Sequence, residues 1–257
     1  MTRSIPIPSC LFLPFFRTDR GEKMSEMLHA QNVGKSFTLH TQGSVTIPVF
    51  QGVEFTLSAG ECIALTGESG SGKSTFMRML YANYTCSSGS ISVLHDGDWL
   101  DITTASPHAI LDMRKRTMGY VSQFLRVIPR VPTLEIVAEP LIALGAPRET
   151  AMEKARDLLT RLRIPERLWQ LSPLTFSGGE QQRVNIARGF IADYPIMLLD
   201  EPTASLDTQN RATVLALIEE AKARGAAIAG IFHDHETRDA VCTGSFDVTS
   251  FKVGAND

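Results

Sequence analysis

The chain has 257 residues, of which 43% are hydrophobic and 21% are charged, and its net charge at pH 7 is −3. This balance is typical of a globular protein and lacks the basic excess of a nucleic-acid-binding protein. No apolar run approaches the roughly 18 residues of a membrane helix, so we expect a soluble chain that does not itself span a membrane.

The N-terminal residues 1–16, MTRSIPIPSCLFLPFF, are apolar but contain three prolines, which block helix continuation. We expect residues 1–26 to be a disordered extension, residues 27–250 a single domain and residues 251–257 a tail. A signal peptide is the alternative for the first segment, although no small-residue cleavage site follows it. The cysteines form no CxxC pair, which favours a reducing compartment over a disulfide or zinc framework: Cys10, Cys62, Cys86 and Cys242.

The segment CIALTGESGSGKSTFMRML predicts a buried strand, a glycine-rich loop and a helix, in that order. The loop fits GxxxxGK[ST], whose backbone amides cradle phosphate oxygens, and Lys73 and Ser74 supply a charge and a magnesium-binding hydroxyl. A flexible Gly/Ser turn with an incidental lysine is the alternative, which the strand–loop–helix context disfavours. We expect nucleotide contacts from Gly67, Glu68, Ser69, Gly70, Ser71, Gly72, Lys73, Ser74 and Thr75.

Residues 124–176 are predicted to be a largely helical insertion. TLEIVAEPLIALG (133–145) has a helical pattern with a break or kink at Pro140. RETAMEKARDLLTRLRI (148–164) places Met152, Ala155, Leu158, Leu159 and Leu162 at helical spacing. In FLRVIPRVP (124–132), exposed Phe124, Leu125 and Val127 would form a docking patch, and buried they would be core. The sequence leaves these alternatives open.

The run SGGE (177–180) fits the capping box S-x-x-E at the start of a helix. A cap alone does not explain Gly178 and Gly179, because each weakens the first turn by roughly 1 kcal/mol relative to alanine. Glycines at a helix N-terminus let an anion approach the amides closely.

Two further apolar runs, PIMLLDEP (195–202) and AAIAGIFHD (226–234), predict buried strands that end in polar residues. At such strand ends, Asp200 is placed to hold Mg²⁺ through water and Glu201 to polarise the attacking water. His233 could donate a hydrogen bond to the γ-phosphate. Two histidines at a strand end, as in the His-Asp-His run at 233–235, are a weak metal signal.

Together these motifs, with SQF at 122–124, SLD at 205–207 and FHD at 232–234, resemble the nucleotide-binding subunits of the ABC ATPase family. The resemblance implies an α/β P-loop NTPase with a RecA-like core and a helical sub-lobe, binding ATP and Mg²⁺. It implies a head-to-tail dimer with a second ABC subunit, either the same chain or a paralogue. Phe176 and Glu180 depart from the commoner leucine and glutamine of the family's signature.

The same resemblance assigns roles to individual residues. Phe37 would stack on adenine, with core packing in a strand as the alternative, and Gln123 would sense the γ-phosphate and Mg²⁺. The catalytic residues would be Lys73, Glu201 and His233, and the metal ligands Ser74, Gln123 and Asp200. The partner subunit's ATP would be contacted by Ser177, Gly178, Gly179, Glu180 and Asp207.

Long segments that extend well beyond these motifs resemble a narrower group, the PhnL subunits of bacterial phosphonate C–P lyase systems: residues 79–91, 121–141, 164–173, 175–207 and 224–234. The likeness implies a cytoplasmic ATPase that works with the C–P lyase core subunits. These turn an alkylphosphonate and ATP into a ribose alkylphosphonate triphosphate. The alternatives are the ATPase of a lipoprotein-release or macrolide-type exporter, for which residues 124–145 discriminate, and a non-catalytic nucleotide-gated scaffold.

Overall fold

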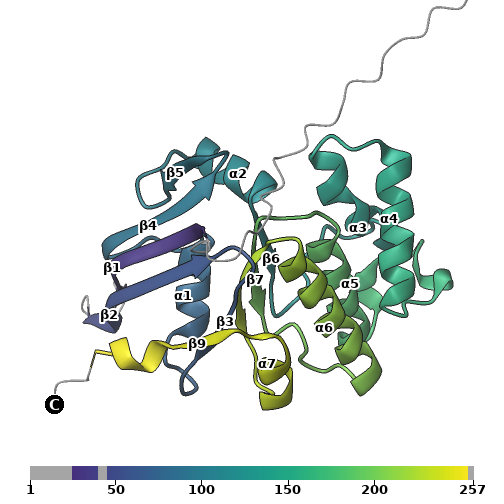
Figure 1. Ribbon diagram of the computed structural model, residues 1–257. Coiled ribbons are helices and arrows are strands. Elements are labelled where there is room, and N and C mark those ends of the chain that lie inside the picture. Colours follow the sequence, from purple (N-terminus) through teal and green to yellow (C-terminus); the bar gives the residue numbers. More distant parts are fainter. Residues whose placement is uncertain (1–24, 40–44, 254–257) are drawn as a thin grey trace, which may run out of the picture.

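The structure, a computed structural model, describes residues 25–39 and 45–253. It contains two β-sheets (Figure 1). The extension expected over residues 1–26 and the tail expected over 251–257 lie largely outside the described residues. Regular structure runs from Glu26 at the start of the first strand to Phe251 at the end of the last 3₁₀ helix.

The first sheet is antiparallel and has the strand order β2-β1-β4-β5. Its strands are β1 (Glu26–Leu39), β2 (Val45–Ser58), β4 (Ser88–His95) and β5 (Asp98–Asp101). Along β2, Val53, Phe55 and Leu57 are buried and the residues between them are exposed, which is the period-two pattern of a sheet with one solvated face. The buried face packs on helix α1 (Lys73–Leu80), where Phe55 and Phe76 meet edge to face.

The second sheet is parallel and has the strand order β6-β7-β8-β3-β9. Its strands are β3 (Cys62–Thr66), β6 (Met118–Val121), β7 (Ile196–Asp200), β8 (Ala227–Ile231) and β9 (Gly244–Asp247). Every residue of β7 and β8 is buried, as expected for strands covered on both faces. The three strands predicted from apolar runs are therefore confirmed, and they are neighbours whose carboxyl ends share one edge of the sheet.

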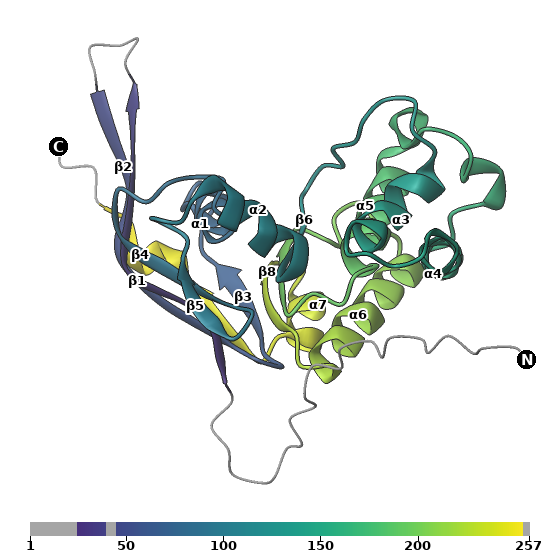
Figure 2. The ribbon, with the colours of Figure 1, turned by 90° about the horizontal axis from the view of Figure 1, so that it is seen from above.

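Helices α3 (Thr133–Ala143) and α4 (Arg148–Arg161) pack on each other and on α5 (Gly178–Phe190). Figures 1 and 2 show this helical group on the opposite side of the parallel sheet from the antiparallel sheet. The apolar spacing predicted for 148–164 is confirmed, since Ala155, Leu158, Leu159 and Leu162 are buried. Of the two expectations for Pro140, a break is wrong, because α3 continues through this residue and ends at Ala143.

Among the remaining helices, α2 (Pro107–Arg116) joins the antiparallel sheet to β6, and α6 (Thr208–Ala223) and α7 (His235–Val241) connect strands of the parallel sheet (Figure 1). The short 3₁₀ turns are η2 (Glu166–Leu168), η3 (Pro173–Thr175) and η4 (Val248–Phe251). Within the described residues, none of the helices combines the length and the apolar character that a membrane span requires.

Two cysteines that lie 180 positions apart meet where β3 begins and α7 ends. The Sγ atoms of Cys62 and Cys242 are 3.6 Å apart, a contact that the sequence spacing did not indicate. A disulfide requires about 2.05 Å between the sulfurs, so both are free thiols here.

Candidate nucleotide-binding and catalytic site

A cavity of about 690 Å³ lies at the carboxyl edge of the parallel sheet, where β3, β7 and β8 end. Residues from all three strand ends line it, so segments far apart in sequence meet at one place. Most of the predicted phosphate loop reaches this cavity, whereas Glu68 and Ser71 are not among its lining residues. The lining includes Gly67, Ser69, Gly70, Gly72, Lys73, Ser74, Thr75, Glu201, His233, His235 and Arg238.

The loop between β3 and α1 has the form of a phosphate cradle. Gly72, the residue before the helix, has φ 98°, a left-handed conformation that disfavours any side chain. Gly70 has φ 77°, and a Cβ added there would project into open space. Lys73 Nζ donates to the carbonyl oxygens of Gly67 at 2.9 Å and Glu68 at 2.8 Å, which holds the ammonium group within the loop. Loop amides, ammonium group and helix N-terminus together suit the phosphates of a nucleotide.

Asp200, the last residue of β7, is 3% exposed. Its Oδ2 accepts a hydrogen bond of 3.1 Å from the Tyr120 hydroxyl, and its Oδ1 has no hydrogen-bond partner. Burial raises the pKa of this carboxyl, because a charge is poorly solvated there, while the Tyr120 hydrogen bond opposes the rise. A buried carboxylate with one unpartnered oxygen beside a phosphate loop fits a Mg²⁺ ligand, either direct or through water.

Glu201 follows Asp200 and has φ 55°, a left-handed conformation rare for a residue with a long side chain. Both carboxylate oxygens are held. Gln123 Nε2 donates to Oε2 at 2.9 Å, and His233 Nε2 lies 2.6 Å from Oε1. A strained backbone at a cavity wall is typical of a functional position. The arrangement fixes one carboxylate where it could accept a proton from water.

The predicted magnesium set is only partly assembled by direct contacts. Ser74 lines the cavity, and Asp200 and Gln123 are not among its lining residues. Asp200 immediately precedes Glu201 in the chain, and Gln123 donates a hydrogen bond to Glu201. Because Glu201 lines the cavity, Asp200 and Gln123 both lie next to the cavity wall. The unpartnered Oδ1 of Asp200 is the observation that favours a metal here.

The signature residues 177–180 form the predicted capping box at the start of α5. Glu180 N donates to Ser177 Oγ at 3.4 Å, and Ser177 N donates to Glu180 Oε2 at 2.9 Å. The Ser177 hydroxyl bond lowers the pKa of Glu180. Gly178 has nothing within 4 Å of an added Cβ, whereas a Cβ on Gly179 would lie 3.3 Å from the Ser205 carbonyl oxygen. The helix N-terminus is therefore open for an incoming group and borders the SLD segment.

The signature segment does not belong to this chain's own nucleotide cavity. Among the described residues that line the cavity, none comes from 177–180 or from 205–207. Asp207 caps α6, accepting from Asn210 N at 2.8 Å, and this bond lowers the pKa of Asp207. The location leaves the signature free to face a second molecule.

Phe37 lies on β1 and is not brought to the cavity. Its ring meets Tyr84 edge to face at 5.7 Å, and Lys35 Nζ lies 4.9 Å from the ring centroid. The ring is half-buried rather than part of the core. Adenine stacking on Phe37 therefore stays a prediction.

Residues 122–132, hereafter the docking segment, connect β6 to α3. Phe124 is 71% exposed and Ile128 is 74% exposed, whereas Leu125 is buried and Val127 is half-buried. Of the two alternatives from the sequence, an exposed patch applies to Phe124 and core packing applies to Leu125. The exposed apolar pair is Phe124 with Ile128, and Ile128 was not singled out from the sequence.

A second cleft of about 430 Å³ lies between α2, β6, α3 and α5. Arg114, Lys115 and Arg188 line it with a single acid, Glu139, which pairs with Arg188 at 3.1 Å. No sequence pattern indicated this cleft or the Tyr120–Asp200 hydrogen bond. The only local signal for the hydrogen bond was Tyr120 itself, three residues before Gln123. It lies in a strand that the sequence does not place beside β7.

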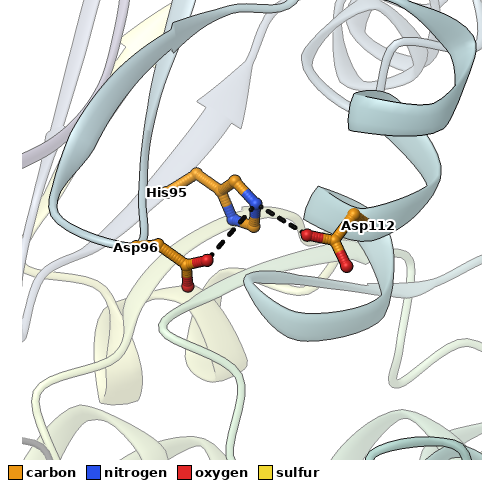
Figure 3. Close-up of side chains that lie close together, drawn as sticks. All are labelled: His95, Asp96 and Asp112. Atoms are coloured by element: carbon orange, nitrogen blue, oxygen red, sulfur yellow. Dashed lines mark hydrogen bonds and ion pairs between the residues drawn. The ribbon is translucent and has the colours of Figure 1, made fainter.

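His95, Asp96 and Asp112 form a cluster that does not line the nucleotide cavity (Figure 3). His95 Nε2 is 3.2 Å from Asp112 Oδ2, and His95 Nδ1 is 2.6 Å from Thr117 Oγ1. The Arg116 guanidinium pairs with both aspartates and lowers the pKa of Asp112 to about 2. The Arg116 cation already neutralises both carboxylates, so the cluster provides no case for a metal. Its contacts join the β4–β5 turn to α2.

Comparisons with known proteins agree with this geometry. The model of a family described as ABC transporter matches residues 50–204. The ATP-binding protein LolD of the lipoprotein-releasing system of Shewanella frigidimarina is 36% identical over 211 residues, which are 82% of this chain and 85% of LolD. The macrolide export ATP-binding/permease protein MacB of Shigella flexneri is 31% identical over 211 residues, covering 82% of this chain and 31% of MacB.

Solved structures show the same fold. The ATP-binding cassette MJ0796, in a dimeric post-hydrolysis state bound to ADP and Pi, is 26% identical with a TM-score of 0.77. The match covers 87% of this chain and 95% of that one. The predicted fold class, an α/β P-loop NTPase of the ABC nucleotide-binding type with a helical sub-lobe, is confirmed.

Proposed function

Because this chain belongs to the ABC ATPase family, we propose that it is an ATP-hydrolysing subunit of a phosphonate C–P lyase system. It would serve the ribose 1-methylphosphonate 5-triphosphate synthase complex and work as a head-to-tail dimer with a second ABC subunit, itself or a paralogue. The observation that carries the hydrolytic part is the Glu201 carboxylate, fixed between Gln123 and His233 at the cavity of the phosphate loop.

In the proposed reaction, the loop amides and Lys73 hold the phosphates, and Glu201 accepts a proton from the attacking water. Water attacks the γ-phosphorus, the bond to the β–γ bridging oxygen breaks, and ADP leaves as phosphate forms. His233, bonded to Glu201, would orient the carboxylate and donate to a γ-phosphate oxygen. A bound Mg²⁺, held by Ser74, Gln123 and Asp200, would neutralise charge on the phosphates.

The dimer is supported by the position of α5. At its N-terminus lie the capping residue Ser177 and two glycines, the first of which has no atom within 4 Å of an added Cβ. Together with the helix dipole, these features suit an anion. This chain's own nucleotide cavity does not include these residues. We infer that Ser177, Gly178 and Gly179 contact the γ-phosphate held by the other subunit, with Glu180 and Asp207 at the same interface.

The C–P lyase assignment rests on the long sequence likeness, above all through 121–141, which contains the whole docking segment. Phe124 and Ile128 present exposed apolar surface there. Isolated exposed apolar side chains are common, but a pair on one connecting segment suits a partner interface. We therefore propose the docking segment and the adjoining α3 as the surface that meets the C–P lyase core subunits.

The second candidate function is the ATPase of a membrane exporter. It is favoured by similarity to LolD and MacB, whose names place them in lipoprotein release and macrolide export. The same surface would then meet a membrane subunit.

The partner can be identified by trapping the Glu201→Gln variant with ATP in its native host grown on a phosphonate, and analysing what co-purifies. C–P lyase core subunits would support the proposal, and a membrane permease would establish the exporter reading. Phe124→Ala should abolish the capture, and Trp99→Ala is the matched control, since Trp99 is an exposed aromatic residue on β5. Equal capture by both variants would exclude the docking segment as the interface.

A further inference from the structure

Tyr120 connects Asp200, the proposed metal-binding carboxylate, to a different part of the molecule. It lies on β6, where its Cα pairs with that of Leu198 on β7, two residues before Asp200. From there the hydroxyl reaches Asp200 Oδ2 at 3.1 Å. The bond holds one carboxylate oxygen and leaves Oδ1, the unpartnered atom, as the free ligand.

The ring of Tyr120 is itself fixed by stacking. Its centroid lies 4.9 Å from that of Tyr81 at an interplanar angle of 28°. Tyr81 directly follows α1, the helix that begins at Lys73 of the phosphate loop. On the Tyr81 ring lies Arg114, whose Cζ is 4.6 Å from the centroid and whose Nε donates to the Tyr81 carbonyl oxygen at 3.0 Å.

This stack ends in the cleft of about 430 Å³. Tyr81, Arg114 and Tyr120 all line the cleft, together with Glu139 of α3. The side chains therefore form a continuous path from a cleft that α3 helps to line to the buried carboxylate of Asp200. Side chains that hydrogen-bond to a metal ligand fix its orientation and contribute to metal affinity.

We propose that Tyr120 is a positioning residue for ATP hydrolysis: its hydroxyl orients Asp200 toward Mg²⁺, and its stacked ring ties that orientation to the cleft at the partner-docking face. The proposal rests on the ATPase function given above. A phenylalanine at this position would keep the stack and lose only the hydrogen bond. Asp200 would then be free to rotate, and its affinity for the metal would fall.

The test measures metal affinity rather than turnover. In the Glu201→Gln background, which we expect to retain ATP, Mn²⁺ replaces Mg²⁺ as the probe. Free Mn²⁺ is measured by electron paramagnetic resonance during titration of the ATP-bound protein. Tyr120→Phe should weaken Mn²⁺ binding about 10-fold, the lower end of the effect expected from losing a partner of a metal ligand. ATP binding without metal should be unchanged.

The matched control is Tyr81→Phe, which removes a hydroxyl from the other ring of the stack and leaves the bond to Asp200 intact. It should bind Mn²⁺ like the parent protein. Tyr120→Phe with unchanged Mn²⁺ affinity overturns the proposal, as does an equal loss in both variants. A lower melting temperature without a change in Mn²⁺ affinity assigns Tyr120 a structural role only and also overturns it. Failure of the parent to bind Mn²⁺ and ATP would instead contradict the proposed function.

Discussion

The Gln123 amide donates a 2.9 Å hydrogen bond to the Glu201 carboxylate across 78 positions of sequence. Gln123 follows β6 and Glu201 follows β7, which are neighbours in the parallel sheet. The first residues of the docking segment are therefore in direct contact with the proposed catalytic base. Movement of the segment on partner binding would change the position of that base.

Glu201→Gln should bind ATP with unchanged affinity and lose turnover by about 10²- to 10⁴-fold, the usual contribution of a general base. The amide keeps the size of the side chain but cannot accept the proton, and the phosphate loop is untouched. Steady-state phosphate release and equilibrium binding of ATP separate the two effects. Rapid hydrolysis by this variant would remove Glu201 from its role.

His233→Ala should reduce turnover by about 10²-fold, comparable to the loss of one donor that stabilises transition-state charge. The substitution removes the 2.6 Å contact to Glu201. His235→Ala is the matched control, since His235 lines the same cavity and its removal leaves both contacts of Glu201 in place. Similar losses in the two variants, measured by phosphate release, would argue against a specific role of His233.

Ser177→Arg should fold as a monomer but fail to form the ATP-dependent dimer, because it places bulk and positive charge against the partner's site. Loss of the helix cap alone costs about 1 kcal/mol, and Ser177→Ala controls for that loss. Sedimentation velocity with ATP, in the Glu201→Gln background, should show dimers for the alanine variant and monomers for the arginine variant. Dimers in both would refute the shared-site reading.

Asp112→Asn should flatten the acid dependence of stability. The folded pKa of Asp112 is depressed to about 2 by Arg116, below the unfolded value of about 3.9. The stabilisation is therefore fully present above about pH 4 and is lost as the pH falls toward 2. Melting temperatures across this range should fall less for Asp112→Asn than for Asp98→Asn, an exposed carboxylate on β5. Parallel pH curves would contradict the pairing with Arg116.

The features that the sequence predicts correctly are local. The strands ending at Thr66 and Asp200 follow from short apolar runs, and the Ser177–Glu180 capping box follows from spacing within one turn. Each depends on residues only a few positions apart. The phosphate loop is of the same kind, because its glycines and Lys73 lie in one segment between a strand and a helix.

The features that it misses depend on strand order. Placing β6 beside β7 brings Tyr120 to Asp200 and Gln123 to Glu201, and no local pattern specifies that order. The contact between Cys62 and Cys242 has the same origin, since it forms where β3 and β9 run side by side. The exposure of Phe124 beside buried Leu125 also depends on how the docking segment lies over the helices.

The central claim, an active site shared between two subunits, is tested most directly by mixing two inactive variants of this chain. Lys73→Ala disables the phosphate loop and Ser177→Arg disables the signature, so neither should hydrolyse ATP alone. In a head-to-tail dimer of the two, one site combines both defects and the other combines an intact loop with an intact signature. Phosphate release should therefore reappear on mixing, up to a fraction of wild-type activity. An active wild-type chain whose variants stay inactive at every mixing ratio would contradict the shared site between copies of this chain.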